Sequence, residues 1–243
     1  MKTYKARGIV LHAIKYGESG AIAYVLTDVG GRRSYIVPGV RSKRGHGNKG
    51  ALLQPMFLIE FEGLENRLSE MHRFRELRSA VTLRSVPFDV RKSTVSLFMA
   101  EMLYRLVREM EPNSPLFDFV WDAVCALDGM EEATGVANFH LWFMVGLSRH
   151  LGFFPGNEWS AGSWFDVREG LFVGHEPWHG NCFSRDNAAL LGTLMTAQAG
   201  ELAAIPLNRT RRVDFLNSML SHFGYHLDAI KDIRSVDILR EVF

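Results

Sequence analysis

The period of the apolar residues changes once along this chain, near residue 80, and that change limits the possible folds more than any other feature. Residues 1–80 alternate apolar and polar types with a period of two, as strands do, and glycine-containing turns interrupt the alternation. From about residue 86 the apolar residues recur with a period of 3.6, as in amphipathic helices. The two periods predict an α+β protein of more than one domain, with a β-structured first part and a helical second part.

Five short strands are predicted in the first part. They cover residues 6–13, 21–27, 32–38, 56–61 and 67–77. Short meandering strands with glycine-rich turns favour a small closed or partly open β-barrel of the OB type, over residues 1–80. A five-stranded SH3-like barrel would give almost the same pattern, so periodicity alone does not distinguish the two folds.

The second part, residues 81–243, is predicted to be all-α. The first expected helix is a long amphipathic segment that ends near Pro112. The second is capped by Ser114, begins at Pro115 and runs through Leu127. Three more helices are expected over residues 137–151, 184–198 and 209–222, followed by a last short helix capped by Ser235 or Asp237. Residues 154–183 are rich in Gly and Trp and are expected to form an irregular insertion.

Charge is distributed unevenly along the chain. The formal net charge is only +1, but residues 1–80 hold 14 Lys and Arg against seven Asp and Glu, whereas the remaining residues hold 14 against 20. The near-neutral sum therefore conceals a basic barrel and an acidic helical part. Residues 25–55, with two turns and a basic, glycine-rich loop, lie at the centre of the basic part.

The basic residues of that stretch are the candidate nucleic-acid site. They are Arg32, Arg33, Arg41, Lys43, Arg44 and Lys49, with Tyr35 and His46 interleaved. Cations on a barrel neutralise phosphates and release counterions, and an aromatic ring among them, here Tyr35, could stack on a base. The alternative to nucleic-acid binding is that the loop is basic only because charged residues keep the protein soluble.

No enzyme is predicted, and neither a catalytic residue nor a cofactor. The chain has no G-x-S-x-G elbow, no Walker-type loop and no G-x-G-x-x-G after a strand. His175, His179 and Cys182 lack a fourth ligand at suitable spacing, so a turn is preferred to a zinc site. His222 and His226 are better explained by helix capping or packing.

The sequence also predicts the compartment. Cys125 and Cys182 form no CxxC pair, which favours free thiols in a reducing cytosol. No apolar run approaches the roughly 18–20 residues that span a bilayer, and the first residues lack a signal-peptide core. A cytoplasmic protein with no membrane partner is expected.

The order of several motifs resembles the RecO family, the bacterial recombination mediators and DNA repair proteins. These motifs are GIVL (8–11), YGES (16–19), VLT (25–27), GG (30–31), VPGVRSKR (37–44) and LQP (53–55). The resemblance continues through F-x-x-x-L-x-x-x-G-F-x-P (143–155) and H-L…I-R-S…I-L (226–239), and so covers nearly the whole chain.

This resemblance implies an OB fold rather than an SH3-like barrel, followed by a helical domain. It also implies binding of single- and double-stranded DNA, strand annealing, contacts with RecR and with the acidic C-terminal tail of single-strand DNA-binding protein, and indirect action on RecA at gapped DNA. A nucleoid-associated location follows. Arg41, Lys43 and Arg44 lie in the matching VPGVRSKR stretch, while Arg32, Arg33 and Lys49 rest on charge alone.

The chain departs from the family pattern at one place. Many members carry a four-cysteine zinc element after the G-[FY]-x-P motif, but residues 156–184 contain only Cys182, so no metal is implied. The aromatic residues of this segment are expected to replace the metal by packing; they are Trp159, Trp164, Phe165, Phe172 and Trp178. The alternative function, of a different class, is a protein-interaction scaffold whose barrel has no direct DNA role.

Overall fold

The computed structural model describes residues 2–40, 49–65 and 71–243. The chain divides into two compact units that meet in sequence between Asp128 and Gly129. The two helices that follow the strands thus belong to the first unit, whereas sequence periodicity groups them with the later helices. Each unit is described by itself.

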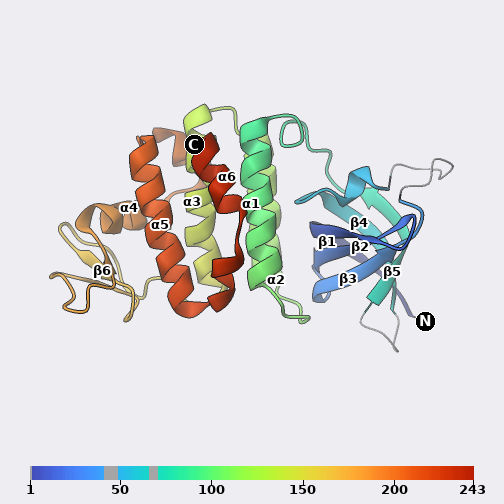
Figure 1. Cartoon of the computed structure of the whole chain (residues 1–243), viewed down its shortest axis with the longest axis horizontal. Coiled ribbons are helices and arrows are strands. Elements are labelled where there is room, and N and C mark those ends of the chain that lie inside the picture. The colour runs from blue at the N-terminus through green and yellow to red at the C-terminus, as the bar shows by residue number, and fades with distance from the viewer. Residues whose placement is uncertain (1, 41–48, 66–70) are drawn as a thin grey trace. The chain divides into compact units, whose positions relative to one another are not determined.

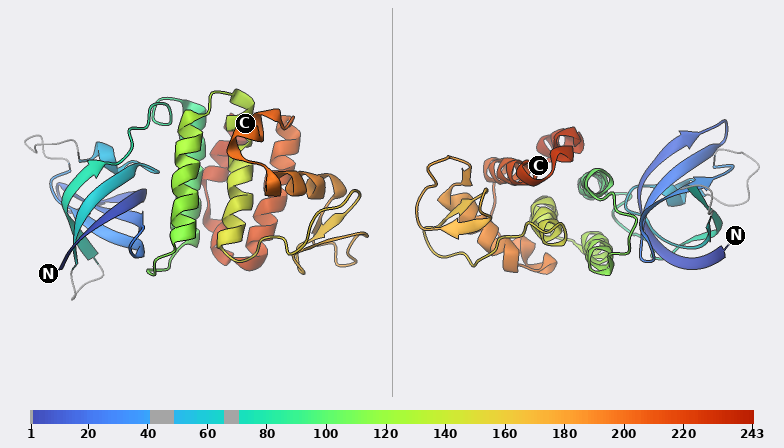
Figure 2. Two further views of the ribbon diagram at one scale, coloured as in Figure 1. Left: turned by 180° about the vertical axis from the view of Figure 1, so that it is seen from behind. Right: turned by 90° about the horizontal axis from the view of Figure 1, so that it is seen from below.

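The first unit begins with a closed five-stranded barrel (Figures 1 and 2). Its strands are β1 (Lys2–Tyr16), β2 (Gly20–Thr27), β3 (Gly31–Val37), β4 (Leu58–Glu65) and β5 (Met71–Ser79), with a 3₁₀ turn, η1 (Ala51–Leu53), before β4. The strand order around the barrel is β1-β2-β3-β5-β4, and all pairs are antiparallel except β3 with β5. In a simple meander β3 would pair with β4. Here β3 pairs with β5 instead, and β4 pairs with β1 to close the barrel. The predicted five-stranded OB barrel is confirmed.

The barrel interior is filled by small and β-branched residues together with the rings of Tyr35 and Phe61. Val10, Val25 and Ile59 are fully buried there. A Cβ added to Gly8 would lie 2.5 Å from Cγ1 of Val25, so the close approach of β1 to this core requires glycine. A bulge in β1 between Val10 and His12 shifts the register against β2 and lets the long strand bend around the barrel.

Two helices complete the first unit. They are α1 (Val90–Leu106) and α2 (Ser114–Gly129), and α1 packs against β1. The paired residues Ile9 and Leu26 lie on the outer face of the barrel yet are buried, because helix residues cover that face. The predicted cap of α2 is corrected: Asn113, whose Oδ1 accepts from the amide of Leu116 at 3.1 Å, caps the helix, and Ser114 is its first residue.

The β2–β3 hairpin contacts the loop between α1 and α2. The amide of Arg32 donates to the carbonyl of Glu109 at 2.9 Å. Gly31 has a φ of +57°, and a Cβ there would lie 2.5 Å from the carbonyl oxygens of both Glu109 and Glu111. Only glycine satisfies both conditions, so the Gly-Gly turn of the sequence fixes the hairpin to this loop.

Asp128 joins the end of the barrel to both helices. Its carboxylate accepts hydrogen bonds from the backbone amides of Arg84, Ser85 and Val86, at 2.8 to 2.9 Å. Nζ of the buried Lys92 donates to the carbonyl of Asp128 at 2.9 Å and to Oγ of Ser85 at 2.7 Å. Burial alone would raise the pKa of Asp128, but the three amides outweigh it and lower that pKa.

The second unit is mainly helical (Figure 1). Its elements are α3 (Ala133–His150), β6 (Trp164–Asp166), β7 (Leu171–Val173), β8 (Cys182–Phe183), α4 (Arg185–Thr196), η2 (Ala199–Ala204), α5 (Arg209–His226), η3 (Asp228–Asp232) and α6 (Ser235–Val242). Helix α3 is buried along most of its length and contacts α4, α5 and η2. Each predicted helix is present, but α1 ends at Leu106 and not near Pro112, and Ser235 is the first residue of α6, not its cap.

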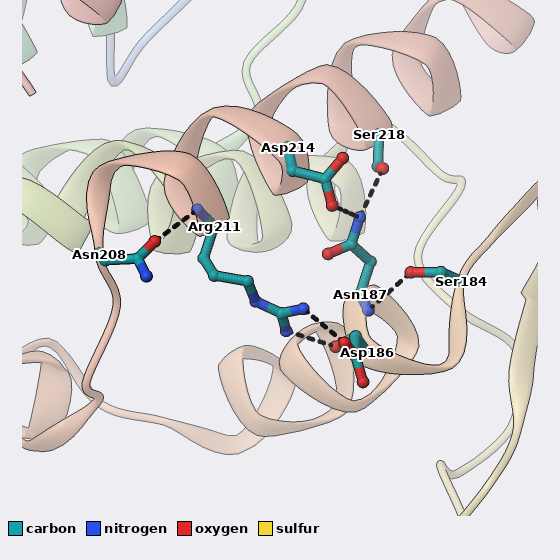
Figure 3. A network of polar contacts seen from close by, with 7 residues as sticks. All are labelled: Ser184, Asp186, Asn187, Asn208, Arg211, Asp214 and Ser218. Carbon is teal, nitrogen blue, oxygen red and sulfur yellow. Dashed lines mark hydrogen bonds and ion pairs between the residues drawn. The ribbon is translucent and has the colours of Figure 1, made fainter.

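Polar contacts join α4 to α5 (Figure 3). Nδ2 of the buried Asn187 donates to Oδ2 of Asp214 and to Oγ of Ser218, both at 2.9 Å. Arg211 pairs with Asp186 at 2.8 Å, and Ser184 caps α4. Because Asn187 is buried and hydrogen-bonded to two residues of α5, the contact fixes the register of the two helices.

The segment predicted to be an irregular insertion contains a small antiparallel sheet with the order β7-β6-β8. Phe165 and Phe172 are buried in it, as the packing hypothesis requires, and Trp164 is half-buried. The hypothesis is wrong for Trp178, which is 93% exposed, and Trp159 is still 40% exposed. The second part is therefore not purely helical, and only some of its aromatic residues form a core.

The histidines singled out in the sequence have packing roles. Nε2 of His179 lies 3.1 Å from Oδ2 of Asp166, and Nδ1 accepts from the amide of Asn181. His222 is buried, and His226 stacks on Phe153. Within the described ranges, no group of three or more His, Cys, Asp or Glu side chains is arranged to hold a metal ion.

In the described part of the chain, no helix has both the length and the hydropathy that crossing a bilayer requires.

Candidate nucleic-acid interface

The basic charge of the barrel is confined to one part of it. Residues 1–55, which include β1 to β3, hold ten Lys and Arg against two Asp and Glu. Residues 56–80, which form β4 and β5, hold four against five. The excess of positive charge in residues 1–80 therefore belongs to residues 1–55 and not to the barrel sequence as a whole.

The β4–β5 side is unsuited to phosphates. Glu62 pairs with Arg75 at 3.2 Å and Glu60 with Arg78 at 2.6 Å, so these arginines are already neutralised. An open cavity of about 520 Å³ lies on this side. Its charged lining residues are Lys5, Arg7, Asp28, Glu60, Glu62, Glu76 and Arg78. The four carboxylates among them would repel a nucleic-acid backbone.

The three best-supported basic residues, Arg41, Lys43 and Arg44, lie outside the described residues. Lys49 follows that gap and is exposed. The assignment of these four residues to DNA stays a prediction.

Arg32 and Arg33 are partly occupied by contacts within the first unit. The guanidinium of Arg32 lies 5.4 Å from the ring centroid of Tyr104 and donates to the carbonyl of the same residue. Nε of Arg33 donates to the carbonyl of Gly30 at 3.2 Å, and its guanidinium lies over the ring of Tyr4. Both side chains are half-buried, so any phosphate contact would share groups that also stabilise the barrel.

The proposed stacking role of Tyr35 is corrected by the structure. Tyr35 is fully buried in the barrel, its hydroxyl lies 2.8 Å from that of Tyr4, and its ring stacks on Phe74 with 4.4 Å between centroids. Burial, followed by the neighbouring Tyr4, raises the pKa of Tyr35. Because side chains alternate along a strand, Tyr35 shares the inward face of β3 with Val37, and it cannot reach a base.

A different set of aromatic rings lies at the barrel surface. His12 and Tyr24 are opposite each other on β1 and β2, and the ring of Tyr104 from α1 lies 4.8 Å and 5.0 Å from theirs. His12 is exposed, and Ile14 and Tyr16, further along β1, are 39% and 46% exposed. Sequence reasoning missed this set, although the period of two in β1 places these three residues on one face.

Two protein-family models match this chain. A family model described as "Recombination protein O N terminal" matches residues 1–82, and one described as "Recombination protein O C terminal" matches residues 87–235. The chain belongs to the RecO family. The first RecO match covers the barrel, and the second begins just before α1.

Relatives support the same assignment over the full length. The chain is similar to the protein named "DNA repair protein RecO" of Bacteroides fragilis, with 35% identity over 241 residues and 98% of each chain covered. The proteins of that name from Phocaeicola vulgatus and Flavobacterium psychrophilum are 33% and 31% identical over 240 residues, again with 98% of each chain covered. The RecO resemblance inferred from the sequence is confirmed.

Proposed function

We propose that this RecO-family DNA repair protein is a non-enzymatic mediator that binds single- and double-stranded DNA and anneals complementary strands. It would also help to load recombinase on gapped DNA coated with single-strand-binding protein. The observation that carries the proposal is the excess of ten basic over two acidic residues in β1–β3 and the adjoining loop. An OB-type barrel with this charge, in a chain that matches the RecO family from end to end, favours a polyanionic partner.

The basic segment would act electrostatically. Two DNA strands repel each other through their phosphates, and a protein that neutralises some phosphates on each strand lowers that repulsion. Annealing of this kind needs no ATP and no catalytic residue. The absence of a phosphate-binding nucleotide loop from the sequence is consistent with such a mechanism.

The second unit would recruit the protein partners, which we propose to be RecR, the C-terminal tail of single-strand-binding protein and, indirectly, RecA. An open groove of about 580 Å³ between α5, η3 and α6 supports the tail contact. Its lining includes the apolar Leu220, Ile230 and Val236, with Lys231 and Arg240 beside them. A peptide with an acidic segment and an apolar end would pack on the apolar residues and would compete with Asp228 and Asp237, which pair with these two cations at 3.0 and 3.2 Å.

The loop assignment is tested by the combined variant Arg41→Ala, Lys43→Ala and Arg44→Ala. We expect roughly tenfold weaker binding of single-stranded oligonucleotide at low salt, because three phosphate contacts are lost. The slope of log K against log salt should become shallower by about 2, since each contact contributes about 0.7. Fluorescence anisotropy over a series of salt concentrations measures both quantities.

A matched control removes three exposed cations elsewhere, through Arg91→Ala, Arg168→Ala and Arg185→Ala. This control should keep the wild-type slope. A loop variant whose slope equals that of the wild type would show that residues 41–44 do not contact DNA and would favour the scaffold alternative for the barrel.

A further inference from the structure

We propose that bases of single-stranded DNA stack on a row of side chains on the outer face of β1, formed by His12, Ile14 and Tyr16 and called here the β1 row. This inference rests on the proposed function and deepens it, because it names where the bases lie while the basic loop holds the phosphates. It also replaces Tyr35, which is buried, as the stacking aromatic.

The pairing of β1 with β2 places the β1 row on the outside. Residues opposite each other in the ladder share a face, and the pair Ala13 and Ala23 lies at the barrel core. The neighbouring partners His12 and Tyr24 must then face outward, and so must Ile14 and Tyr16, because side chains alternate along a strand. Their exposed fractions agree: 39% for Ile14 and 46% for Tyr16.

One end of the row is held in place before any ligand binds. The rings of His12 and Tyr24 lie 6.2 Å apart, and Tyr104 of α1 contacts both. The guanidinium of Arg32 lies over Tyr104 from the other strand of the β2–β3 hairpin. Rings fixed by such contacts lose little conformational freedom on binding, which favours stacking on a flat partner.

The charge of this face selects a nucleic acid as the occupant. β1 to β3 and the following residues are strongly basic in sequence, and the guanidinium of Arg32 lies over Tyr104 at one end of the row. An apolar protein partner would need only the aromatic rings. The basic composition of these strands favours a ligand that combines flat rings with repeated negative charge. Single-stranded DNA has both, and every base presents a face to an aromatic side chain. A duplex keeps its bases stacked internally, so it would meet only the cations.

Tyr16→Ala tests the inference in the full chain. Tyr16 is 46% exposed, so the fold should tolerate its removal. We expect affinity for an oligothymidine to fall roughly 5- to 150-fold, the range for loss of one stacked base. Affinity for a duplex of equal length and the salt slope should not change. Tyr16→Phe should restore binding, because stacking needs the ring and not the hydroxyl.

The control is Tyr225→Ala, which removes an equally exposed tyrosine (50%) from α5. It should bind oligothymidine as the wild type does. As a second readout, ultraviolet crosslinking to an iodouracil-containing oligonucleotide should join the base to the peptide that contains His12 and Tyr16.

Two failures are distinguishable. If Tyr16→Ala binds oligothymidine as tightly as the wild type, and wild-type binding remains salt-dependent, the β1 row is wrong while the proposed function stands. If the wild type itself binds neither single strands nor duplex, the proposed function fails, and the inference with it. Loss of a protein partner from Tyr16→Ala with unchanged DNA affinity would also overturn the inference.

Discussion

Replacement of Asp128 by alanine should lower the free energy of unfolding of the first unit by about 3 kcal/mol. The change leaves the amides of Arg84, Ser85 and Val86 without their carboxylate acceptor. The main-chain carbonyl of residue 128, which accepts from Lys92, is retained. Hydrogen bonds to a charged group contribute more than neutral ones, and here one carboxylate accepts several. Chemical denaturation followed by circular dichroism measures the loss.

Two further variants make the result specific. Asp128→Asn keeps one acceptor oxygen but no charge, so it should lie between the wild type and Asp128→Ala. Asp122→Ala removes an exposed carboxylate from the same helix and should change the free energy of unfolding by less than about 0.5 kcal/mol. If Asp128→Ala were no less stable than Asp122→Ala, the junction would not have the structural role assigned to it.

Acidification from pH 6.5 to pH 4 should lower the free energy of unfolding of the second unit by about 3 kcal/mol through His222 alone. His222 is buried among Phe153, Phe165 and Phe223, and its Nε2 lies 3.1 Å from the carbonyl of Phe153. A carbonyl only accepts, so Nε2 carries the proton of a neutral ring. Burial lowers the pKa of His222 from 6.5 to about 4.

The direction follows from proton uptake. Between pH 6.5 and 4 the unfolded chain protonates this histidine and the folded chain does not, so stability is complete above pH 6.5 and is lost as the pH falls towards 4. Burial lowers the pKa of His140 as well, to about 3, which adds to the same trend. Asp128 acts only at lower pH, because its pKa lies below the ordinary carboxyl value in the folded chain.

The histidine assignment is checked by His222→Gln, which keeps a donor for the Phe153 carbonyl but has no titrating group. Its loss of stability between pH 6.5 and 4 should be smaller than that of the wild type in denaturation followed by tryptophan fluorescence, since four of the five tryptophans lie in the second unit. His175→Gln, at an exposed position, should follow the wild type. Equal pH dependence in all three proteins would contradict the account.

Most of the elements could be predicted from the sequence because their signals are local. The period of two gave five strands, and the period of 3.6 gave the helices. Closure of the barrel by the parallel pairing of β3 with β5 could not be predicted, because it joins segments far apart in the chain. For the same reason the sequence could not show that α1 and α2 pack with the barrel, or that Asp128 joins them.

For the candidate nucleic-acid interface, only the positive charge could be predicted from the sequence. The basic excess of residues 25–55 is a property of the sequence itself, whereas the use of each side chain depends on its neighbours. Tyr35 was assigned to the surface because it lies between arginines, yet the parity of β3 places it with Val37 in the core. The guanidinium of Arg32 carries positive charge but also packs on Tyr104, a residue 72 positions away. The same alternation, applied to β1, places Tyr16 on the outer face as the candidate stacking residue.

The central claim is that this chain neutralises DNA strands and lets them pair. It is tested most directly by the rate at which two complementary oligonucleotides, one labelled with a donor and one with an acceptor fluorophore, anneal with the wild-type protein and without ATP. The account predicts annealing faster than the spontaneous reaction, an acceleration that falls as salt rises, and a smaller acceleration for the variant lacking Arg41, Lys43 and Arg44. A rate equal to the spontaneous one at every protein concentration would contradict it.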